Sequence, residues 1–72
     1  MLSYSDVQLE LAVFKMIDHE IVRDTHDLII TTKSSVGFED VLIVESSNPD
    51  YHKILGLVAR VFNNQQQLQI GA

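Results

Sequence analysis

Two short apolar runs, Leu28-Ile29-Ile30 and Val41-Leu42-Ile43-Val44, constrain the fold of this chain more than any other feature. Both runs are rich in residues that favour strands, and a short connection containing Gly37 separates them. The sequence therefore predicts an antiparallel hairpin with strands near 28–32 and 40–45. A half-buried strand alternates apolar and polar residues, whereas these runs place apolar side chains on both faces of the hairpin. Both faces must therefore be covered.

The chain is short for that task. It has 72 residues and no cysteine, so we expect one domain, without a disulfide or a thiolate metal site. A chain of this size removes only about 60% of its unfolded surface from water when it folds alone. Small folds without such staples often gain stability from a partner subunit. We therefore expect a homo-oligomer, with a dimer favoured. The alternative is a monomer in which one helix covers each face of the hairpin.

A helix is predicted from about Asp6 to Ile21. Ser5 as N-cap and Gln8 three residues later form a capping-box pattern, and apolar residues follow at helical spacing. Most of the circumference of this helix is apolar, which indicates burial on several sides. Residues 7–13 also alternate with the period of a strand. A strand is therefore the alternative for residues 7–17, and it would change the fold class.

A second helix is predicted after Asn48-Pro49-Asp50, which supplies a cap, a proline suited to the first helical position and a carboxylate that complements the helix dipole. Apolar residues then recur at helical spacing from Tyr51 to Phe62. Gly56 inside this helix costs about 1 kcal/mol relative to alanine, which indicates a close backbone contact at that position. The compact domain is expected to span residues 1–64, and residues 65–72 are expected to form a polar, frayed tail.

Together these segments predict an α+β domain with the order helix, strand, strand, helix. An antiparallel β-hairpin packs with the two helices, and a second copy of the chain completes the structure. The apolar faces of the first helix and the hairpin are expected to form interfaces, with nearby carboxylates setting partner choice. The candidate interaction residues are Leu9, Val13, Ile29, Val41, Ile43, Asp18, Glu20, Asp24 and Asp27.

The net charge is −5, and it is unevenly distributed. All ten carboxylates lie within residues 1–50, whereas the charged residues after them are Lys53 and Arg60. An acidic body repels phosphate backbones, so nucleic acid is not an expected partner. No apolar run approaches the roughly 18 residues that span a bilayer, and the first residues lack the pattern of a secretory signal. We expect a cytoplasmic protein without membrane contact.

The sequence contains no recognisable catalytic, cofactor or metal motif. His19, His26 and His52 have carboxylates nearby, but the HxxxH and HExxH spacings of zinc sites are absent. The serines lie in predicted turns without a GxSxG nucleophile pattern, and the three glycines form no phosphate-binding pattern. We therefore expect no enzyme, no cofactor and no metal. Metal-dependent catalysis through His19 and His26 is a minor alternative.

These observations predict a small non-enzymatic protein-interaction module, an adaptor, regulator or accessory subunit that acts as a homo-oligomer. One alternative is an acidic inhibitor of a nucleic-acid-handling protein, in which the carboxylates of residues 18–27 occupy the place of phosphates. Another is a weak nucleic-acid-binding dimer that pairs Lys53 and Arg60 of two C-terminal helices.

Overall fold

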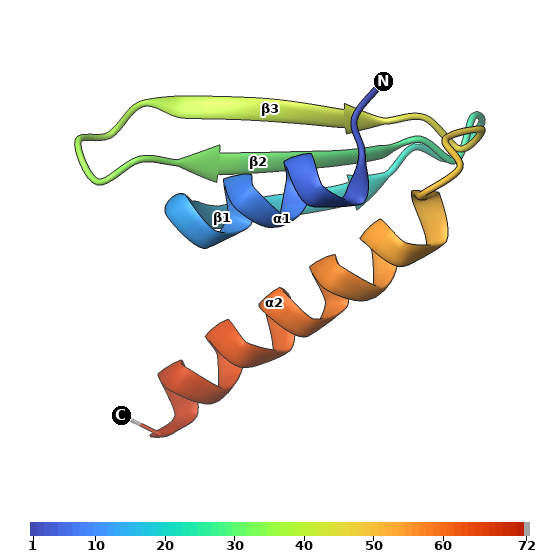
Figure 1. Ribbon diagram of the computed structural model, residues 1–72. Helices are drawn as coiled ribbons and strands as arrows, with labels where there is room; N and C mark the ends of the chain where they lie inside the picture. Colours follow the sequence, from blue (N-terminus) through green and yellow to red (C-terminus); the bar gives the residue numbers. More distant parts are fainter. Residues whose placement is uncertain (72) are drawn as a thin grey trace.

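The computed structural model describes the backbone of residues 1–71 and the side chains of residues 1–65. Three strands form one antiparallel sheet with the order β1-β2-β3, and two helices pack on the same side of it (Figure 1). The α+β class is confirmed, with one strand more than predicted. The elements are α1 (Tyr4–Val13), β1 (Lys15–Ile21), β2 (Leu28–Lys33), β3 (Glu39–Val44) and α2 (Tyr51–Gly71).

The predicted helix over residues 6–21 is wrong in its second half. The helix ends at Val13, Phe14 has extended backbone angles, and the chain continues as β1 from Lys15. Two physical causes favour this strand. Its β-branched residues lose side-chain freedom in a helix, and a two-stranded hairpin is marginal without a third strand beside it. The strand alternative for residues 7–17 is wrong for residues 7–13, which are helical, and correct for residues 15–17, which begin β1.

The start of α1 also differs from the predicted capping box at Ser5 and Gln8. Ser3 is the N-cap: its hydroxyl accepts a hydrogen bond from Asp6 N at 3.2 Å, and its N–H donates to Asp6 Oδ2 at 3.0 Å. These two hydrogen bonds satisfy backbone donors that the first turn of a helix leaves unpaired. Asp6 takes the part that Glu or Gln usually has in this motif.

The predicted hairpin is confirmed as β2 and β3. Leu28 pairs with Val44 at one end of the ladder and Lys33 pairs with Glu39 at the other. Gly37 has a φ of 97°, a left-handed conformation that glycine adopts without the steric cost of a Cβ atom. On its other side β2 pairs with β1, and a bulge between Met16 and Asp18 shifts the register.

The core lies between the sheet and the two helices. Leu28, Ile30 and Thr32 of β2 are at most 1% exposed, whereas Val41 and Ile43 on β3 are more than half exposed. The alternative arrangement with one helix on each face of the hairpin is therefore wrong, because both helices cover the same face. The buried apolar residues are Val7, Met16, Leu28, Ile30, Val44, Tyr51, Ile54, Leu57 and Val58.

The second helix begins at Tyr51, close to the predicted start. Asn48 organises this start: its Oδ1 accepts from Asp50 N at 2.8 Å, and its Nδ2 donates to the carbonyl of Leu2 at 2.6 Å. Asp50 Oδ2 accepts from Tyr4 N at 2.8 Å, so the first turns of both helices are joined. These long-range hydrogen bonds fix α1 against α2 on one side of the sheet.

The middle and the end of α2 differ from expectation. A Cβ atom at Gly56 would meet only the Arg60 guanidinium, at 3.7 Å, so the predicted close backbone contact is absent from the described residues. The helix continues to Gly71. The predicted tail over residues 65–72 lies mostly outside the residues whose side chains are described, and its separation from the domain stays a prediction.

Candidate interaction surface

The face of the sheet opposite the helices is the main candidate surface. Residues paired across neighbouring strands place their side chains on the same face. The strand register therefore shows which residues belong to this face. The pairing gives three rows across β1, β2 and β3, which together we call the open face: Glu20, Ile29 and Ile43; Asp18, Thr31 and Val41; Lys15, Lys33 and Glu39.

The apolar part of the open face lies over β2 and β3. Val41 is 53% exposed and Ile43 is 58% exposed, while Ile29 beside them is half-buried by its neighbours. Ile29 lies on the central strand β2, whereas Val41 and Ile43 lie on the edge strand β3. No described element of the chain covers them (Figure 1).

Charged side chains border this apolar strip on two sides. Asp18 and Glu20 lie along β1, whereas Lys33 and Glu39 face each other across β2 and β3 at the hairpin end. All four of these charged residues are exposed. The open face is therefore an apolar strip with an acidic margin and one end of mixed charge, the pattern of core and rim found in protein interfaces.

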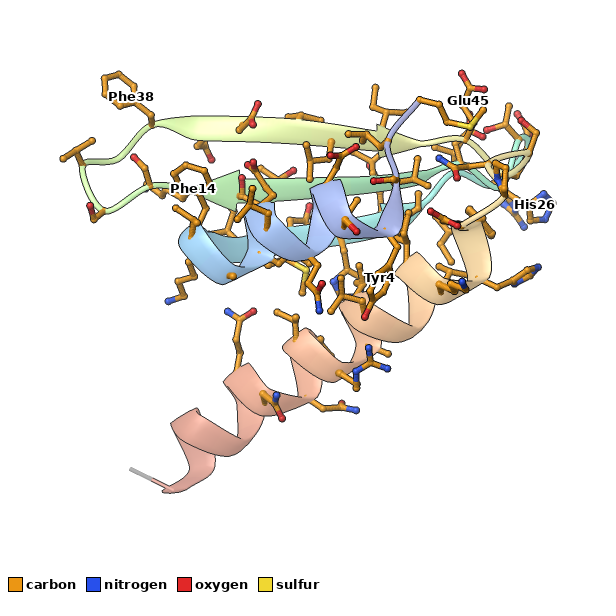
Figure 2. The ribbon with its side chains drawn as sticks, in the orientation of Figure 1. Tyr4, Phe14, His26, Phe38 and Glu45 are labelled. Carbon is orange, nitrogen blue, oxygen red and sulfur yellow. The ribbon has the colours of Figure 1, made fainter. Side chains whose placement is uncertain are left out.

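The hairpin loop extends the apolar surface beyond the strands. Val36 and Phe38 are each 76% exposed, and among the large apolar side chains that the structure describes only Met1 is more exposed. Figure 2 shows the Phe38 ring at the hairpin end, directed away from the two helices. The ring therefore lies on the side of the molecule to which the open face belongs.

Five of the nine predicted interaction residues meet on the open face: Ile29, Val41, Ile43, Asp18 and Glu20. Leu9 and Val13 lie on α1, across the sheet from that face, and are 67% and 64% exposed. The fold of a single chain therefore leaves both side chains uncovered, and their role at an interface stays a prediction. They form a separate, smaller apolar patch.

The other two predicted carboxylates, Asp24 and Asp27, lie in the connection between β1 and β2. Asp27 Oδ1 accepts a hydrogen bond from Ser46 N at 2.9 Å, which joins this connection to the one after β3. The four predicted carboxylates therefore divide into two groups, one on the sheet and one in a turn.

The three histidines lie in different elements, β1, the turn before β2 and α2. His19 packs edge-to-face against Phe62, with ring centroids 5.0 Å apart, while His26 lies in the turn and contributes its carbonyl as an acceptor for the Tyr51 hydroxyl. The ring of His52 packs against Tyr51 on α2. Within the described residues, no group of three His, Asp or Glu side chains converges in the way that a metal ion requires.

The cations of α2 belong to different environments. Lys53 is exposed, and Arg60 Nη2 donates to the hydroxyl of Tyr4 at 3.2 Å, so Arg60 contributes to the packing of α1 on α2. None of the helices, as far as they are described, has the length and apolar character needed to cross a membrane.

A hollow beside β1 is a feature that sequence reasoning missed, because the strand itself was missed. It has a volume of about 340 Å³ and lies between β1 and the second half of α2. The β-branched residues at positions 17, 21 and 22 favour a strand, and they could have indicated it in the sequence. The lining residues are Lys15, Met16, Ile17, Asp18, His19, Phe62 and Gln65.

Comparison with known proteins gives no relative: no family model matches the chain, and neither the curated proteins nor the solved structures contain a match.

Proposed function

We propose that this chain is a small non-enzymatic interaction module that acts as a homodimer, with the open faces of two copies packed together. The observation that carries the proposal is the uncovered apolar strip of Ile29, Val41 and Ile43, opposite a face that two helices cover. A sheet is stable in water when its apolar faces are packed against another layer. In this chain both helices are already used on the first face.

The register of the open face suits packing against a second copy. Consider a twofold axis that runs parallel to the strands, midway between β2 and β3. Each row of one copy then lies opposite the same row of the other copy, with β2 of one copy facing β3 of the other. An isologous interface requires this kind of self-matching. Ile29 lies opposite Ile43 of the second copy, and Thr31 lies opposite Val41 of the second copy. The apolar strip of each copy is thereby covered by the apolar strip of the other copy.

The charges are consistent with this arrangement. In the third row Lys33 lies opposite Glu39 of the second copy, and Glu39 lies opposite Lys33, so two ion pairs form at one end of the interface. Asp18 and Glu20 on β1 fall outside the twofold contact, at the rim, where water solvates them. An axis perpendicular to the strands would instead bring the two Asp18 carboxylates together, and like charges across an interface cost several kcal/mol.

The open face is small for a stable dimer interface. A face of three strands, six residues long, covers only about 14 by 20 Å, less than the roughly 800 Å² per partner of a standard stable interface. The exposed loop residues Val36 and Phe38 add apolar area at the hairpin end. We therefore expect a dimer that dissociates on dilution.

Light scattering on a size-exclusion column over a range of concentrations tests the proposal. The wild-type chain is expected to approach twice its 8.1 kDa mass as concentration rises, and Ile43→Lys is expected to remain monomeric. Leu9→Lys is the matched control, because Leu9 is similarly exposed but lies on α1. A wild-type monomer at every concentration, or a dimer that only Leu9→Lys disrupts, would refute packing through the open face.

A further inference from the structure

A second surface of the molecule, the outer edge of β1, is built to receive an extended chain. The sheet order β1-β2-β3 leaves β1 at an edge, and no described strand pairs with its outer side. An unpaired edge offers backbone donors and acceptors to a partner strand. The hollow of about 340 Å³ runs beside this strand and is lined by five consecutive β1 residues, from Lys15 to His19.

Gln65 already makes one of the contacts that a partner strand would make. Its Nε2 donates to the Met16 carbonyl at 3.0 Å, so this carbonyl faces α2. The other atom of the same amide, Gln65 Oε1, is buried and accepts no hydrogen bond from any described residue. A buried acceptor without a donor is costly, and an incoming N–H group would satisfy it.

The side chains along β1 determine which side chains a bound segment should have. On the helix side of the strand lie Met16, the His19 ring packed on Phe62, and Ile21. Phe62 is 39% exposed and Ile21 is 51% exposed, so apolar area remains available there. On the opposite side Asp18 and Glu20 are exposed on the open face.

A strand added beside β1 alternates its own side chains between these two sides. We infer that the β1 edge and its hollow bind an extended segment of another protein in which Lys or Arg alternates with apolar residues. The basic side chains lie next to Asp18 and Glu20, the apolar ones cover Phe62 and Ile21, and a backbone N–H donates to Gln65 Oε1. A second copy of this chain is a poorer occupant, because its β1 would place carboxylates beside carboxylates.

This surface is separate from the proposed dimer contact, which centres on β2 and β3. The test uses a dye-labelled peptide, Lys-Val-Lys-Leu-Lys-Val-Lys-amide, and fluorescence anisotropy. The control peptide Lys-Lys-Val-Leu-Val-Lys-Lys-amide has the same composition and charge without the alternation. The alternating peptide is expected to bind at least tenfold more tightly. Equal binding of the two peptides, or binding of neither, overturns the inference.

Variants locate the contact. Phe62→Ala is expected to weaken binding about tenfold, a change of about 1.4 kcal/mol. Asn63→Ala, at the exposed neighbouring position, is expected to leave binding unchanged. Asp18→Asn combined with Glu20→Gln is expected to weaken binding and reduce its salt dependence. If Phe62→Ala and Asn63→Ala bind alike, the hollow is not the site.

Two further measurements identify the mode of binding. The first distinguishes pairing at the strand edge from unspecific charge attraction, and the second shows whether peptide binding depends on the dimer contact. Methylation of the peptide amide nitrogens at one alternate set of positions is expected to abolish binding, while methylation of the other set is tolerated, since only one set faces β1. Ile43→Lys is expected to bind the peptide as the wild type does, whether or not the chain dimerises. Peptide-induced amide shifts on β3 rather than residues 15–19 would contradict the inference.

Discussion

The hydroxyl of Thr32 donates a 3.0 Å hydrogen bond to the carboxylate of Glu10, joining the middle strand of the sheet to α1. Thr32 is fully buried, and it is one of two buried polar residues among the side chains described. The contact matters for the open face, because it fixes α1 on the opposite side of the sheet. Val7 and Leu11 of the same helix contribute to the apolar packing there.

Thr32→Val is therefore expected to destabilise the chain by about 1–3 kcal/mol, because it leaves a partly buried carboxylate without its donor. Replacing both partners, as in Glu10→Leu combined with Thr32→Val, is expected to recover most of that loss. Urea denaturation of the two single variants and the double variant measures the coupling. Additive effects in this cycle would mean that the hydrogen bond contributes nothing of its own.

The Ser3–Asp6 capping box predicts a pH dependence. Hydrogen bonds from the Ser3 backbone N–H and side chain lower the pKa of Asp6 below its ordinary value of 3.8. A lowered folded-state pKa stabilises the fold at pH values above 3.8, and this contribution disappears as the pH falls through the lower folded pKa. Asp6→Asn should therefore lose part of the slope of stability against pH in this acidic window.

Carbon-detected NMR titration of the Asp6 carboxyl group measures this pKa directly. In Ser3→Ala the side-chain partner is lost, so the pKa of Asp6 is expected to rise toward 3.8. Ser5→Ala is the control, since Ser5 lies within α1 and outside the capping box. An Asp6 pKa that is the same in the wild type and in Ser3→Ala would show that the capping box does not hold this carboxylate.

Gly56 predicts a stabilising substitution. It lies inside α2, and a Cβ atom there would make an ordinary van der Waals contact of 3.7 Å with the Arg60 side chain. Gly56→Ala should therefore stabilise the chain by about 1 kcal/mol, because alanine restricts the unfolded chain and favours the helix. The reverse change at an exposed position of the same helix, Ala59→Gly, should cost a similar amount. A thermal unfolding series that shows Gly56→Ala to be destabilising would reveal a steric role for the glycine.

Sequence patterns predicted the elements whose local signals agree with their final packing. The hairpin has strand-forming residues on both sides of a glycine turn, and α2 has an apolar stripe after a well-defined start. The strand β1 could not be found in this way. Lys15 and Met16 favour helix locally, and the strand forms because β2 provides a partner for pairing.

The exposed sheet face was foreseen only in part. The apolar residues on both faces of the hairpin indicated that something must cover each face, and this reasoning selected Ile29, Val41 and Ile43. Which face the helices take depends on long-range contacts such as Tyr4 N to Asp50 and Thr32 to Glu10. Spacing along the chain carries no information about contacts of this kind.

The pairing of Lys33 with Glu39 gives a test of the dimer that depends on charge and not on apolar area. In the proposed dimer, Lys33→Glu places two carboxylates opposite each other at both symmetry-related positions. Its dissociation constant should therefore rise well above that of the wild type. Exchanging both charges, Lys33→Glu with Glu39→Lys, restores opposite charges within the chain and between the two copies. The double variant should therefore dimerise approximately as the wild type does.

Lys15→Glu is the control for this exchange, because Lys15 lies on β1 in the same row but outside the twofold contact. It changes the net charge by the same amount as Lys33→Glu and should change dimerisation much less. Sedimentation equilibrium at low ionic strength measures all four proteins, since salt screens pairs at the rim of an interface. If Lys15→Glu and Lys33→Glu weaken the dimer equally, net charge governs the association and the twofold axis between β2 and β3 is wrong. If only Lys33→Glu weakens it and the exchange restores it, the two residues face each other across the interface.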